Sequence, residues 1–275
     1  MSQGFTGSPL AVPISGANGG TGVVNSGKTI TIGGNFTLSG AYTLTETLTA
    51  NSSFTLPTTG ACINKVVSQI FTGAGTYTYT PTAGMQYCII YCVGSGGAGG
   101  GAVNPGSNIA SCGSGGGAGA LSVSTVSKAT IGASQTVTIG AGGTAVSGAG
   151  GNNGNTTSVG SIITASGGSG GAVGGSANNV VGSFAQGGAP GTGDVAIRGN
   201  YGSASVIVAA GQALSGGGGI SIFGTAGLPR SSVLAGNAGV NGSGGGGSLA
   251  YNASGASAGG AGGDGIVVIY EYVCA

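Results

Sequence analysis

The chain has no histidine, no tryptophan and very little charge. Of its 275 residues, five are Lys or Arg and four are Asp or Glu, so charged residues make up 3% and the net charge is +1. General acid–base catalysis, metal ligation and nucleophile activation need more such groups. Five scattered cations also form no basic stripe for nucleic acid. We therefore expect a protein that is not an enzyme and has no cofactor, no metal and no nucleic-acid partner.

Long hydrophobic runs are lacking as well. The longest, residues 88–93 and 266–270, are far too short to cross a bilayer. Residues 1–20 show neither the basic nor the apolar region of a signal peptide. We expect no membrane insertion, and synthesis in a cytoplasm followed by release through a route without a signal, such as cell lysis.

Cysteine is present in an odd number and without a CxxC motif, at positions 62, 88, 92, 112 and 274. On one strand Cys88 and Cys92 would share a face but lie ~13 Å apart, too far for a disulfide. Reduced, buried thiols are the expected state.

Glycine is the abundant residue, with 68 copies, or about a quarter of the chain, against ~7% in an average protein. Disordered chains are hydrophilic and highly charged, whereas this one is 40% hydrophobic with a mean hydropathy of +0.39. Collagen is excluded because glycine does not recur at every third position and only seven prolines are present. The composition therefore predicts an ordered glycine-rich protein.

The N-terminal part alternates between apolar residues and threonine. Over residues 29–56 the apolar side chains occupy even positions, at 30, 32, 36, 38, 42, 44, 48, 54 and 56, and most threonines occupy odd ones. This period of two predicts half-buried strands. These apolar residues are too few to form a hydrophobic core within one chain. We therefore expect several copies of the chain to pack together as a homotrimeric β-prism-like stalk. The predicted divisions are an attachment segment (1–22), the stalk (23–70) and a glycine-rich head (71–275).

The head begins with strand-like sequences and continues with glycine runs. Thr76–Thr80 and Met85–Val93 are candidates for a β-hairpin, joined by the turn-forming residues 81–84. Beyond residue 93, glycine runs alternate with short β-like stretches at 121–126, 136–139, 159–164, 205–208 and 266–270, and nothing predicts a helix. The expected fold class is all-β with extensive irregular, polyglycine II structure.

Ordering a glycine on folding costs ~0.5–1 kcal/mol more conformational entropy than ordering an alanine. So many ordered glycines therefore need a compensating interaction. The runs carry few side chains, so main-chain amides must supply it. Extended helices of the polyproline II type have no internal hydrogen bonds, but side by side they can bond laterally. We predict a rigid layered lattice of such helices, with connecting loops displayed at its ends.

Two kinds of short motif are interpreted as coincidental. Residues 22–29 match the Walker A pattern, but they follow a glycine-rich turn and run into a predicted strand, without the flanking strand and helix that phosphate binding needs. The glycosylation sequons at Asn35, Asn51, Asn155, Asn241 and Asn252 are expected to be unmodified because no secretion signal is visible.

The segments that interrupt the glycine runs hold most of the large and charged residues of the head. Aromatic and arginine side chains dominate recognition energetics, and loops on a rigid scaffold concentrate binding residues. The alternative is that each ring only covers an end of the lattice. The candidate receptor-binding residues are Asn178, Phe184, Arg198, Tyr201, Phe223, Arg230 and Tyr251. Of these, Arg198 and Tyr201 are three apart, a spacing that suits a glycan or an acidic loop.

Several stretches resemble the glycine-rich domain of bacteriophage tail fibres. Residues 75–97 resemble its opening, 131–140 its middle and 262–272 its ending, and residues 14–22 are similar to a turn element near the start of tail-fibre segments. The resemblance implies a trimeric virion component whose tip contacts a host surface protein or glycan and whose N-terminus docks on another tail or baseplate protein. The chain departs from related adhesins by carrying its own stalk, and no family receptor residue can be transferred to it.

These observations favour a non-enzymatic tail-fibre or tail-tip protein, made in the host cytoplasm and released by lysis. The alternative is a structural protein that assembles into an extracellular filament or coat without a receptor. A glycan depolymerase is disfavoured because glycoside hydrolysis needs two carboxylates at a fixed separation. With Glu46 in the stalk and Glu271 near the C-terminus, only Asp194 and Asp264 remain.

Overall fold

The computed structural model describes residues 63–209 and 211–274. All of them belong to one compact unit, Thr58–Ala275. The predicted attachment segment, most of the predicted stalk, the Walker-like stretch, Cys62 and the sequons at Asn35 and Asn51 lie outside the described residues. The last residues assigned to the stalk belong to a strand of this unit, as shown below.

The described residues are nearly all β, which confirms the all-β part of the predicted fold class. They form fourteen strands and one four-residue helix, α1 (Lys128–Ile131). The expectation of no helix is wrong at this point, because Ser127 caps the N-terminus by accepting a hydrogen bond from the Thr130 amide, and Gly132 ends the helix with a positive φ of 70°.

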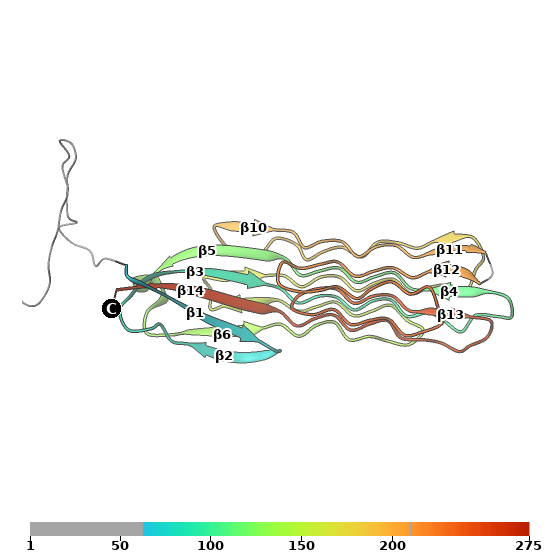
Figure 1. The fold of residues 1–275 in the computed structure, drawn as a ribbon, viewed down its shortest axis with the longest axis horizontal. Coiled ribbons are helices and arrows are strands. Elements are labelled where there is room, and N and C mark those ends of the chain that lie inside the picture. Colours follow the sequence, from blue (N-terminus) through green and yellow to red (C-terminus); the bar gives the residue numbers. More distant parts are fainter. Residues whose placement is uncertain (1–62, 210, 275) are drawn as a thin grey trace, which may run out of the picture. The chain divides into compact units, whose positions relative to one another are not determined.

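Two antiparallel sheets pack together at one end of the unit, here called the basal end (left in Figure 1). The five-stranded sheet has the order β1 (Lys65–Thr72), β14 (Ile266–Val273), β3 (Met85–Val93), β5 (Leu121–Ser127) and β10 (Val195–Ile197). The four-stranded sheet has the order β2 (Gly75–Tyr79), β6 (Gln135–Ile139), β7 (Thr157–Val159) and β8 (Ile163–Ala165). Buried side chains of both sheets form the main core, including Tyr79, Ile90, Val137, Ile163 and Ile269.

The predicted hairpin of residues 76–80 and 85–93 is wrong in its pairing. Strand β2 pairs with β6, whereas β3 lies between β14 and β5. The turn carries the chain from one sheet to the other, and Tyr79 and Met85 on its two sides are both fully buried in the shared core. The turn-forming residues 81–84 therefore predicted where the chain reverses direction, but they did not predict the sheet to which each strand belongs.

Two smaller sheets lie at the opposite, distal end (right in Figure 1). One pairs β4 (Ala110–Cys112) with β13 (Leu249–Tyr251), and the other has the order β12 (Gln212–Leu214), β11 (Val206–Ala209) and β9 (Val180–Val181). Ala110, Cys112, Ile207 and Leu249 form a small buried cluster between them.

Between the two ends the glycine-rich segments run back and forth as undulating chains (Figure 1). Two of them, residues 94–102 and 113–120, are buried along their whole length. In the first segment, the amides of residues 94, 97 and 100 donate to the carbonyls of 120, 117 and 114. The amides of 95, 98 and 101 donate to the carbonyls of a second neighbour, at 155, 152 and 149. The amides of 96, 99 and 102 donate to those of a third, at 263, 260 and 257. These N···O distances are 2.8–3.2 Å. Three successive residues thus bond three different neighbours, a period of three that differs from the two-sided pattern of a sheet.

Glycine is required here by close approach of the neighbouring backbones. A Cβ added to Gly97 would lie 2.1 Å from the carbonyl oxygen of Ser169, and one added to Gly96 would lie 2.0 Å from that of Ser243. Both distances are far below a normal contact. The interior of this glycine block is therefore built from main-chain atoms, with only alanine and serine side chains such as Ala98 and Ser114 admitted.

Candidate functional site

The structure distributes the seven predicted receptor-binding residues along the unit and does not bring them together. Asn178 lies in the loop before β9, and Tyr251 ends β13, so both are at the distal end. Ala185 bridges to Gly202, which places Phe184 and Tyr201 on adjacent antiparallel segments. These two rings are 70% and 57% exposed, the most exposed aromatic side chains among the described residues.

The two arginines among the candidates are engaged with nearby backbone. In Arg230, Nε donates to the carbonyl of Ala235 at 2.8 Å and Nη2 donates to Oδ1 of Asn237 at 2.6 Å. In Arg198, Nη1 donates to the carbonyl of Gly187 at 3.2 Å. Each guanidinium therefore braces its own loop, and Arg198 sits near the basal end, adjacent to β10.

Phe223 lies against the basal five-stranded sheet. Its ring meets Tyr91 edge to face, with the centroids 6.1 Å apart and an interplanar angle of 79°. It packs on a cluster of Val93, Ile266 and Val268. For this residue, the structure shows apolar packing away from the distal loops.

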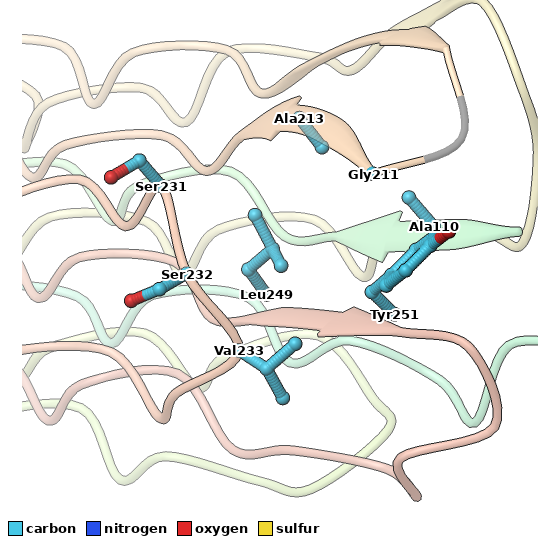
Figure 2. Close-up of a pocket in the computed structure, with 8 residues that line it drawn as sticks. All are labelled: Ala110, Gly211, Ala213, Ser231, Ser232, Val233, Leu249 and Tyr251. Carbon is cyan, nitrogen blue, oxygen red and sulfur yellow. The ribbon is translucent and has the colours of Figure 1, made fainter.

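A pocket of about 220 Å³ opens at the distal end. Figure 2 shows that it is assembled from β4, β13, the start of β12 and the loop before Leu234, with the lining residues Ala110, Gly211, Ala213, Ser231, Ser232, Val233, Leu249 and Tyr251. Gly211 has a φ of 76° in the turn between β11 and β12, and a side chain there would approach the Tyr251 ring to 3.5 Å. The lining combines one aromatic ring, small apolar groups and two hydroxyls, without a charged residue.

An exposed apolar surface adjoins this pocket on the three-stranded distal sheet. Val206 lies opposite Leu214 on one side and Val181 on the other, so the three side chains form a row across the sheet. Val181 is 71% exposed and Val208 is 64% exposed. We call Val181, Val206, Val208 and Leu214 the distal apolar face. Sequence reasoning sought aromatic and arginine residues and missed it, although the β-branched run at 206–208 was the available signal.

The carboxylates of the described residues act as acceptors for neighbouring groups. Asp194 accepts from the Thr125 amide at 2.8 Å, and Asp264 accepts from the amides of Gly142 and Ala74 at 2.8 and 3.1 Å. Glu271 is fully buried and accepts from the Tyr79 hydroxyl at 2.7 Å. Burial, together with this bond to Glu271, raises the pKa of Tyr79. These three carboxylates thus connect chain segments that are far apart in the sequence.

The described cysteines are free thiols. Cys88, Cys92 and Cys112 are buried and Cys274 is partly exposed, which confirms the expectation of unpaired thiols at these four positions. Burial raises the pKa of Cys92 to about 12 and that of Cys88 to about 11. The buried thiols are therefore protonated at neutral pH and poor nucleophiles.

In the described part of the chain, no three or more His, Cys, Asp or Glu residues lie close enough together to hold a metal ion. In the same residues no helix is both long and apolar enough to cross a membrane.

Comparison with known proteins identifies the family. A family model described as a glycine-rich domain matches residues 71–272, and the chain therefore belongs to this glycine-rich domain family. The match confirms the glycine-rich part of the resemblance noted in the sequence. No curated protein matches the chain.

Proposed function

We propose that this protein is a non-enzymatic phage tail-fibre or tail-tip protein that binds a receptor on the host cell surface through its distal end. The observation that carries the proposal is the distal apolar face beside the Tyr251 pocket. Contiguous exposed apolar surface usually marks an interaction site. An aromatic anchor in a pocket surrounded by uncharged groups suits a host surface protein or the apolar face of a glycan.

The glycine block supports this role as a scaffold. Its three-residue hydrogen-bond period is that of polyglycine II, a helix with three residues per turn whose amides bond to neighbours. We infer that 94–102 and 113–120 are the central helices of such a lattice. Since its interior is fixed by main-chain bonds, the loops at its ends are held in place while their sequences are free to differ.

The path of the chain supports attachment at the basal end. Lys65 lies opposite Val273 in the basal sheet, so the described unit begins and ends at the same place, and the distal loops are farthest from both ends. In our proposal residues 1–22 dock on another tail or baseplate protein and the copies form a homotrimer. The protein is then a virion component, made in the host cytoplasm and released by lysis.

Competition for adsorption tests the proposal. Purified full-length protein, added to host cells before the phage that carries it, should block adsorption. Tyr251→Ala and Val208→Asp should each weaken the block roughly tenfold or more, as expected for central contact residues. Tyr77→Ala, which truncates a partly exposed tyrosine at the basal end, is the matched control and should retain the block. Failure of the wild-type protein to block, or an equal loss in the control, would reject the distal site.

The alternative is a structural protein that polymerises into a filament or coat. It is favoured by one observation, namely that β1 and β12 each pair on one side only among the described strands. Such edges can template pairing with another chain. Mass photometry separates the two proposals, because a discrete trimer supports the fibre and open-ended polymers support the filament.

A further inference from the structure

The outer surface of the five-stranded basal sheet is apolar and lined by tyrosine. Side chains that alternate with the core residues point away from the core, and they come from all five strands. We call this set the basal apolar face: Val66 and Ile70 of β1, Tyr270 and Tyr272 of β14, Tyr87, Ile89 and Tyr91 of β3, Val123 of β5, and Val195 and Ile197 of β10.

Strand register arranges these side chains in rows. Tyr272 lies opposite both Val66 and Tyr87, and the two tyrosine rings stack with centroids 4.5 Å apart and an interplanar angle of 10°. Tyr91 and Tyr270 meet edge to face at 6.0 Å. At the margins of the sheet, Ile70 is 61% exposed and Ile197 is 52% exposed. The rings thus form a preorganised central platform with exposed aliphatic groups on both sides.

This face carries no charge. On the five strands the charged residues are Lys65 and Glu271, and Glu271 points into the core, where it is fully buried. Lys65 lies opposite Val273, which also belongs to the core side. The exposed charges next to the face are Asp194 and Arg198, which flank β10 at its margin. Its centre has no counter-charge for a polyanion, and an equally uncharged apolar surface is the suitable partner.

The face is also large. With strands ~4.8 Å apart and ~3.3 Å per residue, four strands of seven to nine residues and the three residues of β10 give roughly 550 Å². That is the upper end of what a monomer commonly leaves exposed, and it approaches the ~800 Å² that a standard interface takes from each partner. Phe223 covers the part next to the glycine block, where it packs on Val93, Ile266 and Val268 and against the Tyr91 ring. Tyrosine is enriched at such interfaces.

We propose that the basal apolar face is an interface between copies of this chain, with the three faces of a trimer turned toward a common axis. The inference rests on the proposed function, which includes the trimer. In the proposed trimer the alternating residues 29–56 join the copies, and the chain continues from them into β1, the outermost strand of this face. The eight residues from 57 to 64 span at most ~29 Å. Copies joined by the alternating segment therefore have their basal faces within reach of one another.

Cross-linking tests the contact directly. Ser68 is exposed on β1 between Val66 and Ile70. In full-length protein with Cys62→Ser and Cys274→Ser, Ser68→Cys should form covalent dimers with a short bis-maleimide, because each chain then offers one accessible thiol. Val208→Cys, exposed on the distal face, should not form them. Absence of cross-links in Ser68→Cys, or cross-links only in Val208→Cys, would overturn the proposal.

A charge introduced on the face tests its contribution. Ile70→Asp and Tyr270→Asp should each weaken association at least tenfold in mass photometry across a dilution series, because the carboxylate would be desolvated at the interface. Val208→Asp should associate as the wild type does. Thermal unfolding of each variant checks that the unit remains folded. If Ser68→Cys cross-links but both aspartate variants associate normally, contact is through the free backbone of β1 and the face itself is not the interface.

The two proposals fail separately. A folded Ile70→Asp monomer that still binds cells would support the basal interface and leave receptor binding intact. Wild-type protein that cross-links through Ser68→Cys but does not block adsorption would support the interface and refute the receptor role. Wild-type protein that is monomeric at all concentrations would refute both the interface and the trimer of the proposed function, and the adsorption assay would then decide receptor binding separately.

Discussion

Adding a single methyl group inside the glycine block should destabilise the whole unit. Gly97 is buried, its amide donates to the carbonyl of Gly117 at 2.9 Å, and its carbonyl accepts from Gly245 at 2.9 Å. In Gly97→Ala the new Cβ would lie 2.1 Å from the carbonyl oxygen of Ser169. That oxygen also accepts a bond from the Gly117 amide at 2.8 Å. Relief of the clash therefore strains several bonds of the block at once.

The size of the effect follows from two contributions. Overpacking in a close-packed interior costs ~1–3 kcal/mol, and a shift of about 1 Å in Ser169 would break or weaken about two main-chain bonds worth ~1 kcal/mol each. The free energy of unfolding should therefore fall by ~3–5 kcal/mol. For a unit of this size the melting temperature should drop by roughly 10 °C or more.

Denaturant and thermal unfolding of full-length protein at one fixed concentration measure this change. Gly175→Ala is the matched control, because Gly175 is exposed and a Cβ there meets nothing within 4 Å. This control should be neutral or slightly stabilised. If Gly97→Ala unfolds within ~0.5 kcal/mol of Gly175→Ala, a size that ordinary surface substitutions produce, the account of a block held by closely approaching main chains is wrong.

The remaining predictions concern the core and the thiols. Glu271→Ala should cost ~2–4 kcal/mol in denaturant unfolding, because the Tyr79 hydroxyl, the Thr82 amide and the Gln69 amide, which all donate to Oε1 of the carboxylate, would lose their acceptor. Asp194→Ala, which removes the acceptor of one exposed bond, should cost less than half as much. At pH 8 an aromatic disulfide reagent should modify Cys274 in the native protein and reach Cys88, Cys92 and Cys112 only after unfolding. Burial raises the folded pKa of Cys88 and Cys92 above the ordinary value of 9.0, to about 11 and 12. The contribution of these thiols to the free energy of unfolding is therefore fully present below pH 9 and is lost as the pH rises from 9 towards the folded pKa values. Cys92→Ala should then reduce the fall in the free energy of unfolding between pH 8 and pH 11. An unchanged fall would refute this assignment.

Local patterns predicted strands better than their pairing. The alternation of threonine and tyrosine at 76–80 and the apolar run at 266–270 mark strands that the structure shows as β2 and β14. The pairing of β1 with β14 joins residues about 200 positions apart, and no local pattern carries that information. The predicted strand at 159–164 is instead the turn between β7 and β8, where Gly160 has a φ of 49°.

The candidate site was predictable only in outline. Large side chains in the interrupting segments led to Tyr251, which does line the distal pocket. Whether a loop lies at the basal or the distal end depends on how many times the preceding chain crosses the glycine block, and the sequence does not show this number. For this reason Phe223 and Arg198 were predicted together with residues that lie at the other end. The valines of β9 and β11 become a surface only when their strands pair.

The hydrogen bonds of the glycine block run across its long direction (Figure 1). A force between the distal loops and the basal sheet, where the described unit begins and ends, would thus load many of these bonds together in shear. It would not break them one at a time. Mechanical toughness of this kind needs no large hydrophobic centre. In the function that we propose, this resistance would keep the distal end bound to its receptor when flow exerts a force on the virion.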